Sequence, residues 1–377
     1  MSASSAPTSA AGVRCSDAKT GMPERIVIGW DIGGAHVKAS RLQSGALLDA
    51  AQWPCPLWQG VAELETALGA ARARWPDLAM HHHAVTMTGE MVDAFANRED
   101  GVRRIAQLLG RALPQPRFFA GDAGWCGALE AGATWRHIAS ANWFATAQHA
   151  ACLLPDAQGV LVDIGSTTTD LIPFRRGHVL TANRGDALRL EHSELVYQGV
   201  VRTPLCALAQ RIGWQHAGRA TKVNVMNEFF ATTADVYRLT GELDAAHDQH
   251  PAPDNGAKDL AGSRVRLARM IGLDARDASD SEWHCFARGW RAAQLIELRE
   301  QLGRVLAAHA LHAQVLLVGA GCGAFLVPEL ARPGWRHVNY APDLVRIGPQ
   351  APADTAAWAQ ICASSVAVAA LFARDHD

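Results

Sequence analysis

Two short stretches of the chain place an aspartate just before a glycine-containing turn. The first is IGWDIGGAHVK at residues 28–38, and the second is VLVDIGSTTTD at residues 160–170. In each, an apolar run ends in an aspartate, Asp31 or Asp163, which predicts a buried strand that enters a tight hairpin. Glycine allows close approach of the main chain to an anion, and successive amide groups of such a turn can bind phosphate oxygens. A neighbouring carboxylate can hold Mg²⁺ against those phosphates.

Several side chains around these turns are candidates for contact with an anionic ligand. Asp31 and Asp163 are predicted to be catalytic carboxylates that hold the metal ion. Lys38, on the next strand, either reaches a phosphate or is a solvated strand lysine. Arg202, in a VRTP segment, either binds a diphosphate or carboxylate through two nitrogens or caps a helix. The donors predicted to line the phosphates are Gly33, Gly34, Gly165, Ser166, Thr167 and Thr168.

The two turns occupy equivalent points of a repeated order of elements. One such turn alone is typical of an ordinary hairpin, so the repeat strengthens the prediction. Apolar periodicity and turn residues predict the order β-β-β-α-β-α-β-α twice. In the first copy the expected strands are 25–31, 36–42, 46–53, 83–88 and 117–120, and the helices are 60–75, 102–113 and 138–154. In the second copy the strands are 159–165, 170–174, 178–181, 315–318 and 336–340, the last helix is 353–372, and a helix-rich insertion covers about 183–313.

A third glycine-rich turn, VGAGCG at residues 318–323, lies where a predicted strand meets a helix. It lacks the G-x-G-x-x-G pattern that opens a dinucleotide-binding fold, and by itself it indicates close packing. The order and spacing of the three turns resemble the actin-like superfamily of sugar kinases, heat-shock ATPase chaperones and actin. In that superfamily the third turn faces adenosine, which would place Gly319, Gly321 and Gly323 in a nucleotide-like pocket.

The resemblance covers residues 25–372 and implies an α/β fold. Two ribonuclease-H-like lobes would enclose a cleft, and the helical insertion would enlarge the second lobe. The expected organisation is a disordered tail at 1–24, a first lobe at 25–157 and a second lobe at 158–377.

The second turn continues as DIGSTTTDLIPF and resembles the hydantoinase A/oxoprolinase family. It also resembles the activators of dehydratases, which bind an iron–sulfur cluster through cysteines. The eight cysteines of this chain are scattered singly, with no C-x-x-C spacing. That distribution is typical of buried thiols in a reducing cytoplasm and argues against an activator.

Three further segments narrow the resemblance: ELVYQGVVRTP at 194–204, NEFFATTADVYRLTG at 227–241 and DQHP at 248–251. Together with the two turns they resemble a subfamily linked to tetrahydromethanopterin-dependent one-carbon transfer, whose archaeal members resemble a methanofuran-core synthase. This implies a transferase that couples an aminomethylfuran-methyl diphosphate to the phenol oxygen of a tyramine- or tyrosine-glutamate acceptor and releases pyrophosphate. Mg²⁺ is the expected cofactor, and ATP is not expected.

That reaction needs a group that takes the phenolic proton, whose pKa is about 10. Glu228 and Asp235 are two turns apart on a predicted helix, so either one is the catalytic base or both are ordinary helix charges. Tyr237 and Phe229 either line an aromatic pocket or belong to the core.

A histidine- and aspartate-rich loop, AAHDQHPAPDNG, follows in the insertion. Its candidate ligands have no regular spacing, so a mobile active-site loop is favoured over a zinc site. The residues concerned are His247, Asp248, His250 and Asp254.

Composition limits the possible partners. Lys and Arg total 35 and Asp and Glu total 37, for a net charge of -2, so nothing predicts binding to nucleic acid or a membrane surface. The expected protein is cytoplasmic, with small-molecule partners and a possible homodimer. The alternatives are an ATP-dependent small-molecule kinase, a hydantoin- or oxoproline-type hydrolase, and a nucleotide-binding regulatory protein.

Overall fold

The computed structural model describes residues 26–312 and 314–376, and two six-stranded mixed sheets form its centre. The predicted tail at 1–24 lies outside these residues. The first sheet has the strand order β3-β2-β1-β4-β5-β6. Its strands are β1 (Val27–Ile32), β2 (His36–Gln43), β3 (Ala46–Pro54), β4 (His82–Met87), β5 (Arg117–Phe119) and β6 (Trp125–Gly127).

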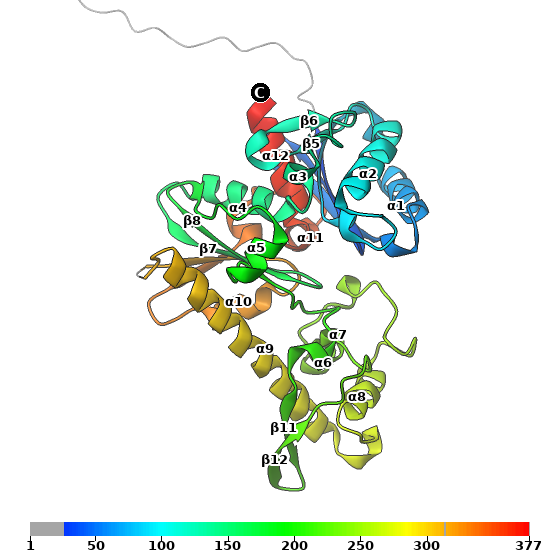
Figure 1. Ribbon diagram of the computed structural model, residues 1–377, viewed down its shortest axis with the longest axis vertical. Coiled ribbons are helices and arrows are strands. Elements are labelled where there is room, and N and C mark those ends of the chain that lie inside the picture. The colour runs from blue at the N-terminus through cyan, green and yellow to red at the C-terminus, as the bar shows by residue number, and fades with distance from the viewer. Residues whose placement is uncertain (1–25, 313, 377) are drawn as a thin grey trace, which may run out of the picture.

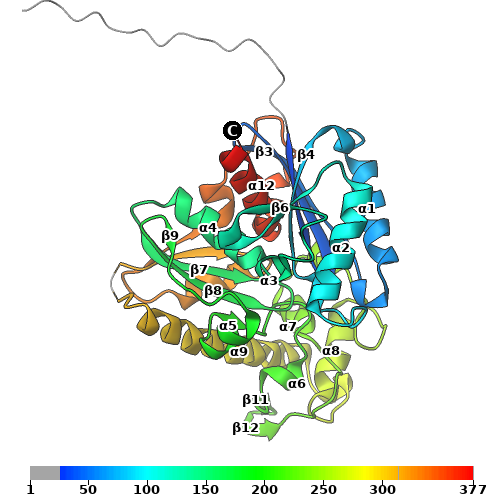
Figure 2. The same ribbon diagram turned by 45° about the horizontal axis from the view of Figure 1, so that its top comes forward.

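Both faces of the first sheet are covered, because every residue of β1 is buried. Ile28, Trp30 and Ile32 share one core with α1 (Ala62–Arg74) and α2 (Arg98–Ala112). On the opposite face, α12 (Ala363–His376) packs on β1, β2 and β4. This contact needs Gly29, since a Cβ there would lie 1.9 Å from the carbonyl oxygen of Ser365. Figure 2 shows the sheet between these two helical layers.

The second sheet repeats the arrangement of the first. Its strand order is β10-β8-β7-β13-β14, with β9 paired to β8; β7 and β8 are antiparallel, and β13 runs parallel to β7. Asp163 pairs with Asp170 across β7 and β8, just as Asp31 pairs with Lys38 across β1 and β2. The strands are β7 (Gln158–Ile164), β8 (Thr169–Arg175), β9 (His178–Val179), β10 (Leu195–Val196), β13 (Leu316–Ala320) and β14 (Arg336–Asn339).

Two helices lie between the sheets and join the lobes. α4 (Asn142–Leu153) packs on α12 and also on β8 and β9. Successive residues of the second sheet point to opposite faces, and each face belongs to a different hydrophobic core. Leu161 and Ile172 face α4, while Val160 and Val162 face α9. The remaining short helices of the lobes are α3 (Trp135–Ile138) and α10 (Val327–Leu330).

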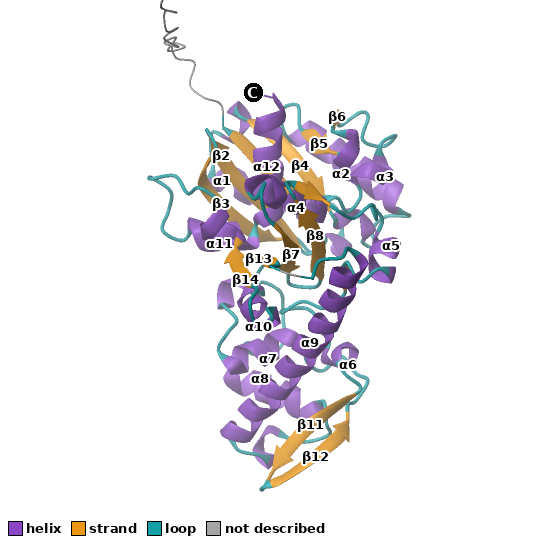
Figure 3. Cartoon of the chain, turned by 90° about the vertical axis from the view of Figure 1, so that its left-hand side faces the viewer, coloured by secondary structure: helices purple, strands orange, loops and turns teal. Residues whose placement is uncertain are grey.

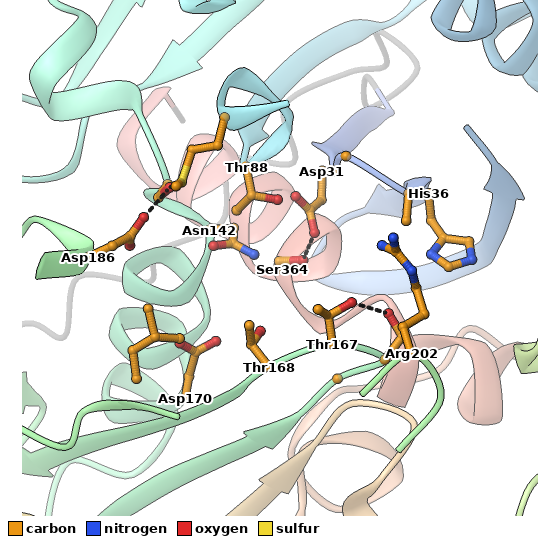
Figure 4. Close-up of a pocket in the computed structure, with 18 of the residues that line it drawn as sticks. Asp31, His36, Thr88, Asn142, Thr167, Thr168, Asp170, Asp186, Arg202 and Ser364 are labelled. Carbon is orange, nitrogen blue, oxygen red and sulfur yellow. Dashed lines mark hydrogen bonds between the residues drawn. The ribbon is translucent and has the colours of Figure 1, made fainter. Parts of the chain in front are cut away.

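Two predicted helices are interrupted. The helix expected at 353–372 is instead α11 (Thr355–Ile361) followed by α12, with a bend of 92°. The helix expected at 138–154 is broken where Ser140 has a φ of 51°, which separates α3 from α4. In both cases the break turns a polar residue of the second helix, Ser364 or Asn142, toward the region between the lobes (Figure 4).

The insertion projects away from the two sheets (Figures 1 and 3). Its helix α9 has 29 residues and so spans about 43 Å. The insertion is mainly helical, and it also contains an antiparallel hairpin of β11 (Arg211–His216) and β12 (Arg219–Asn224), which was not expected. Ala217 and Gly218 close it with positive φ values of 48° and 76°. The insertion helices are α5 (Asp186–Glu191), α6 (Leu205–Leu208), α7 (Thr233–Thr240), α8 (Leu260–Arg269) and α9 (Asp280–Ala308).

The predicted fold is confirmed: the chain is an α/β protein with two ribonuclease-H-like halves. The seven described cysteines are all unpaired, although Cys152 and Cys285 are exposed, contrary to expectation. Within 26–312 and 314–376, no single helix is long and apolar enough to cross a membrane. By length and composition alone, the bent pair of α11 and α12 passes the same test.

Candidate active site

The first turn, residues 33–36, is a hairpin whose backbone groups are only partly used. The amide of Gly33 donates to the carbonyl oxygen of His36 at 2.9 Å. In the described chain, the amides of Gly34 and Ala35 donate to no acceptor. They remain available to an anion. Gly89, after β4, supports the turn closely, since a Cβ there would lie 3.1 Å from the Gly33 carbonyl oxygen.

The second turn, residues 165–168, has the same backbone. The amide of Gly165 donates to the carbonyl oxygen of Thr168 at 2.8 Å, and the amides of Ser166 and Thr167 have no acceptor among the residues described. Gly199 packs directly against this turn, because a Cβ on it would lie 2.5 Å from the Thr167 nitrogen. The repeated motif has therefore folded into two equivalent hairpins with free amide groups.

The two turns border one cleft between the lobes, here called the main cleft, with a volume of about 540 Å³ (Figure 4). Arg202 extends from the side of the second turn toward His36 on the opposite side. The main cleft gathers most of the residues predicted for the site. Those that line it are Asp31, Gly33, Gly34, Lys38, Asp163, Gly165, Ser166, Thr167, Thr168 and Arg202.

Asp31 is buried and held from two helices. The hydroxyl of Ser364 in α12 donates to its Oδ2 at 2.5 Å, and Asn142 at the start of α4 also hydrogen-bonds to it. Its Oδ1 has no partner within the described residues. Burial raises the pKa of Asp31, while Lys38 and the two hydrogen bonds act in the opposite direction.

The surroundings of Asp163 stabilise its negative charge less than those of Asp31 do. Burial, and then the neighbouring carboxylate of Asp170, raise the pKa of Asp163 to about 7, although Lys38 partly offsets them. Asp170 is itself in an ion pair with buried Arg189, whose guanidinium lies 4.2 Å from the ring of Trp143. Asp163 is therefore poised to gain most from a cation in the main cleft.

Lys38 supplies a positive charge between the two aspartates. It pairs with Asp31 across β1 and β2, and Asp163 is also close enough to affect it. Burial opposes the charged amine, but the carboxylates outweigh burial and raise the pKa of Lys38. The amine is thus charged and lies in the main cleft, where a phosphate can contact it.

The carboxylates can be tested as ligands of a magnesium ion. The described residues hold no cluster of three or more His, Cys, Asp or Glu that could form a complete protein cage. Mg²⁺, however, usually binds one or two carboxylates together with substrate phosphates and water. Asp31, with its unpartnered Oδ1, and Asp163 fit that pattern.

The two predicted base candidates lie outside the main cleft. Glu228 is exposed and precedes α7, which begins at Thr233, so it shares no helix face with Asp235. Asp235 is buried, completes a capping box at the start of α7, and accepts from Arg266 at 2.8 Å and Arg238 at 3.1 Å. The shared-face prediction is wrong because the helix starts later than the sequence suggested.

The third glycine turn packs against the second sheet and does not border the main cleft. Gly321 has a φ of +80°, and a Cβ there would lie 2.3 Å from the Ile164 carbonyl oxygen. The amide of Gly323 donates to that same oxygen at 2.8 Å. Gly319 lies within β13. Gly321 and Gly323 therefore allow the turn after β13 to pack tightly against the end of β7, whereas Gly319 faces Val327 and Asn339.

A second, smaller cavity of about 320 Å³ opens beside the main cleft, and is called the side cavity here. Trp58 and Arg202 line both spaces. Phe229, which is 56% exposed, also lines the side cavity. Tyr237 does not, since it is buried in the core and its hydroxyl donates to Gln294 at 2.7 Å.

The histidine- and aspartate-rich loop borders the side cavity without forming a metal cluster. Asp248 pairs with Arg238 at 2.5 Å, and Asp254 pairs with Arg266 at 3.1 Å. His250 lies against the first turn, and its Nε2 is 2.9 Å from the carbonyl oxygen of Ala35. The loop thus connects the insertion to the first lobe.

Sequence reasoning missed several residues of the main cleft. Ser364 and Asn142 are polar positions in Ala-rich helical segments, which was a usable signal. Thr88 follows β4 at the same sheet edge as Asp31, as expected for parallel neighbours. Asp186 and Arg189 lie on α5, and nothing local in the sequence places that helix beside the turns.

The paired lobes and the facing turns define an actin-like fold. A nucleotide-free acetone carboxylase structure shares this fold, with a TM-score of 0.52 at 10% identity over 92% of this chain and 70% of that chain. The Hydantoinase/oxoprolinase family model matches residues 81–347, and the chain belongs to that family.

Two curated relatives are each named (4-{4-[2-(γ-L-glutamylamino)ethyl]phenoxymethyl}furan-2-yl)methanamine synthase. The protein of Methanocaldococcus jannaschii is 30% identical over 297 residues, which cover 78% of this chain and 86% of the relative. The protein of Methanococcus vannielii is 34% identical over 127 residues, which cover 34% of this chain and 55% of the relative.

Proposed function

We propose that this protein is a transferase of methanofuran-type cofactor biosynthesis. It joins an aminomethylfuran-methyl diphosphate to the phenol oxygen of a tyramine- or tyrosine-glutamate acceptor and releases pyrophosphate. The observation that carries the proposal is the pair of equivalent hairpins with free amides that face one cleft.

The main cleft suits a diphosphate leaving group. As the bond between the furanylmethyl carbon and the diphosphate oxygen breaks, negative charge grows on the diphosphate. The free amides of both turns, the Ser166 and Thr167 hydroxyls and the Lys38 amine can stabilise that charge. These donors are fixed by the fold, so little reorganisation is needed during the reaction.

Asp31 and Asp163 would hold Mg²⁺ beside the diphosphate. The metal ion would neutralise charge on the leaving group. The residues of this chain do the remaining work: Ser364 and Asn142 orient Asp31, while Lys38 limits the repulsion between the two carboxylates.

The third turn supports a diphosphate ester over a nucleotide. In actin-like nucleotide-binding proteins that turn faces adenosine, whereas here Gly319, Gly321 and Gly323 do not line the main cleft. The relatives' name also describes an ether between a phenol oxygen and a furanylmethyl carbon. Both points favour a transfer that does not use ATP.

The test is pyrophosphate release by purified protein with Mg²⁺, the furanylmethyl diphosphate and γ-glutamyltyramine or tyrosine. We expect stoichiometric ether and pyrophosphate without ATP. A strict requirement for ATP would instead support the kinase or the hydrolase. Tight ATP binding with no turnover of any small molecule would support a regulatory protein.

A further inference from the structure

The side cavity lies next to the place where the diphosphate would sit. Trp58 and Arg202 form the common wall of the two spaces, so a ligand in one can reach a ligand in the other. Beyond that wall, much of the lining is apolar and comes from Phe229, Pro251 and Pro253. A flat aromatic ligand fits such a lining.

Most charges around the side cavity are already paired. Arg238 binds both Asp235 and Asp248, and Asp235 also binds Arg266. A carboxylate in this position is a poor base, because taking up a proton would break its ion pairs. Asp235 and Asp248 therefore serve the structure of the cavity.

His250 differs from these residues, because no ion pair of the described chain involves its ring. Its Nε2 lies 2.9 Å from the Ala35 carbonyl oxygen, which can only accept, so Nε2 carries the hydrogen. In the neutral ring the lone pair is then on Nδ1, for which the described residues provide no hydrogen-bond partner. The ring is held between His36 and Trp58, with centroid distances of 4.7 Å and 5.5 Å.

The environment keeps this imidazole neutral at physiological pH. Burial lowers the pKa of His250, and the nearby Arg202 and Lys258 charges lower it further. The Ala35 hydrogen bond and the Asp248 carboxylate oppose this shift. His36, in ring contact, stays neutral too, since burial lowers its pKa well below the usual value.

We propose that the side cavity is the acceptor subsite for a phenol and that Nδ1 of His250 takes the phenolic proton. This inference rests on the proposed transferase function. The phenol oxygen forms a bond to the furanylmethyl carbon, whose bond to the diphosphate oxygen breaks with its electron pair leaving on pyrophosphate. The phenolic proton moves to Nδ1, and the imidazolium later releases it to water.

Arg202 is the residue that links the two halves of this step. Its guanidinium lies 5.0 Å from the Trp58 ring and has no carboxylate partner among the described residues. It therefore remains free to contact the diphosphate from the side of the phenol. The positive charge of Arg202 also lowers the pKa of His250. The imidazolium formed in the reaction therefore releases its proton readily, and the neutral base is restored.

The deciding variant is His250→Gln, because the glutamine amide nitrogen can still donate to the Ala35 carbonyl. We expect kcat with γ-glutamyltyramine to fall by about 10²–10⁴-fold. The KM for the diphosphate should not change. At saturating Mg²⁺, which keeps Asp163 ionised, the acid limb of the wild-type pH profile is set by the lowered imidazole pKa and should disappear in the variant.

A ring-fluorinated γ-glutamyltyramine, whose phenol is far more acidic, provides the specific readout. An ionised phenol needs no base, so this acceptor should restore most of the rate of His250→Gln. The matched control is His247→Gln, which removes a histidine of the same loop that contacts Trp358 and lines neither cavity. Its kinetics should match the wild type. Equal losses with both acceptors, or wild-type rates in His250→Gln, would overturn the role of His250.

The subsite can be tested separately from the reaction. Equilibrium dialysis should show tyramine binding to wild-type protein in the presence of pyrophosphate and Mg²⁺, and weaker binding to Phe229→Ala. Absence of tyramine binding would overturn the subsite even if the enzyme is active. Binding without any pyrophosphate release would instead overturn the proposed function and leave the phenol site standing.

Discussion

In the first turn, two helices supply the hydrogen bonds that hold Asp31, whereas in the second turn the aspartate lies beside another carboxylate. The backbones are the same, with one closing bond of 2.9 Å and one of 2.8 Å. The side chains differ, since the first turn carries Gly34 and Ala35 where the second carries Ser166 and Thr167.

The two turns therefore have different electrostatic roles. The first turn offers amides and an aspartate already oriented by Ser364 and Asn142. The second adds hydroxyl donors and an aspartate whose charge is poorly stabilised until a ligand arrives. The duplicated fold thus gives the two turns the same backbone geometry. The side chains around each turn determine how well its aspartate is stabilised as an anion.

The largest expected effect is on the two aspartates. Asp31→Asn and Asp163→Asn should each lower kcat by about 10³-fold with the fold retained. If both carboxylates bind one metal ion, the double variant should lose little more than either single variant. Additive losses in steady-state kinetics would show that the two turns act independently, and wild-type turnover of Asp163→Asn would refute its metal role.

The pH dependence of stability should distinguish the turns next. Folded Asp163 keeps its proton up to about pH 7, whereas an unfolded aspartate loses it near 3.8. Ionisation therefore lowers the stability of the folded protein as pH rises through this window. In EDTA, the free energy of unfolding of Asp163→Asn should exceed that of the wild type at pH 8, and the gain should vanish toward pH 4.

Asp31→Asn is the comparison for that experiment. Its stabilisation at pH 8 should be smaller, because Ser364 and Asn142 already stabilise the charged form of Asp31. Urea denaturation of both variants at several pH values measures the difference. Equal gains would mean that the helix hydrogen bonds do not distinguish the two sites.

The glycines that support the turns give a third comparison. Gly199→Ala places a Cβ 2.5 Å from backbone atoms of the second turn, which cannot move away without distorting it. Gly89→Ala meets the end of the Leu57 side chain at 2.8 Å, which can rotate, and two backbone oxygens at the first turn at 3.1 Å, a milder clash. We expect a loss of about 3 kcal/mol for Gly199→Ala and about 1 kcal/mol for Gly89→Ala in chemical denaturation. Calorimetry should show weaker pyrophosphate binding mainly for Gly199→Ala.

A smaller effect is expected from the helix contact of the first turn. Ser364→Ala removes the donor to Asp31 at 2.5 Å but leaves Asn142. Mg²⁺ affinity in the presence of pyrophosphate should fall by about 10-fold, as for other residues that orient a metal ligand. An unchanged affinity would mean that the ligand, and not the helix, orients Asp31.

The smallest effect is expected outside both turns. Glu228 is exposed and borders neither cavity, so Glu228→Gln should change kcat and KM by less than about 2-fold. A large loss in kcat would return Glu228 to the list of candidate bases and weaken the assignment to His250.

Both turns could be predicted because their signal is local. A strand, an aspartate and a glycine hairpin are specified within about ten residues, and the repeat pointed to one shared cleft. The hairpin of β11 and β12 also had a local signal, since the apolar Ile212 and Trp214 alternate with Arg211, Gly213 and Gln215 before an Ala-Gly turn.

The partners of the turns could not be predicted in the same way. Ser364 and Asn142 meet Asp31 only because two interrupted helices cross between the sheets. His250 reaches Ala35 from a loop that is 215 positions away. Such contacts depend on packing across the whole molecule, and apolar periodicity contains no information about them.

Because α12 packs on β1, the first lobe cannot finish folding until α12 has been synthesised. Asp31 and Ser364 are 333 positions apart, and α12 covers the face of the first sheet that Gly29 leaves open. Until α12 has left the ribosome, that apolar face is exposed to solvent and Asp31 lacks the hydrogen bond from Ser364. The emerging chain must therefore carry an unfinished lobe through most of translation, a period in which chaperone binding would protect it from aggregation.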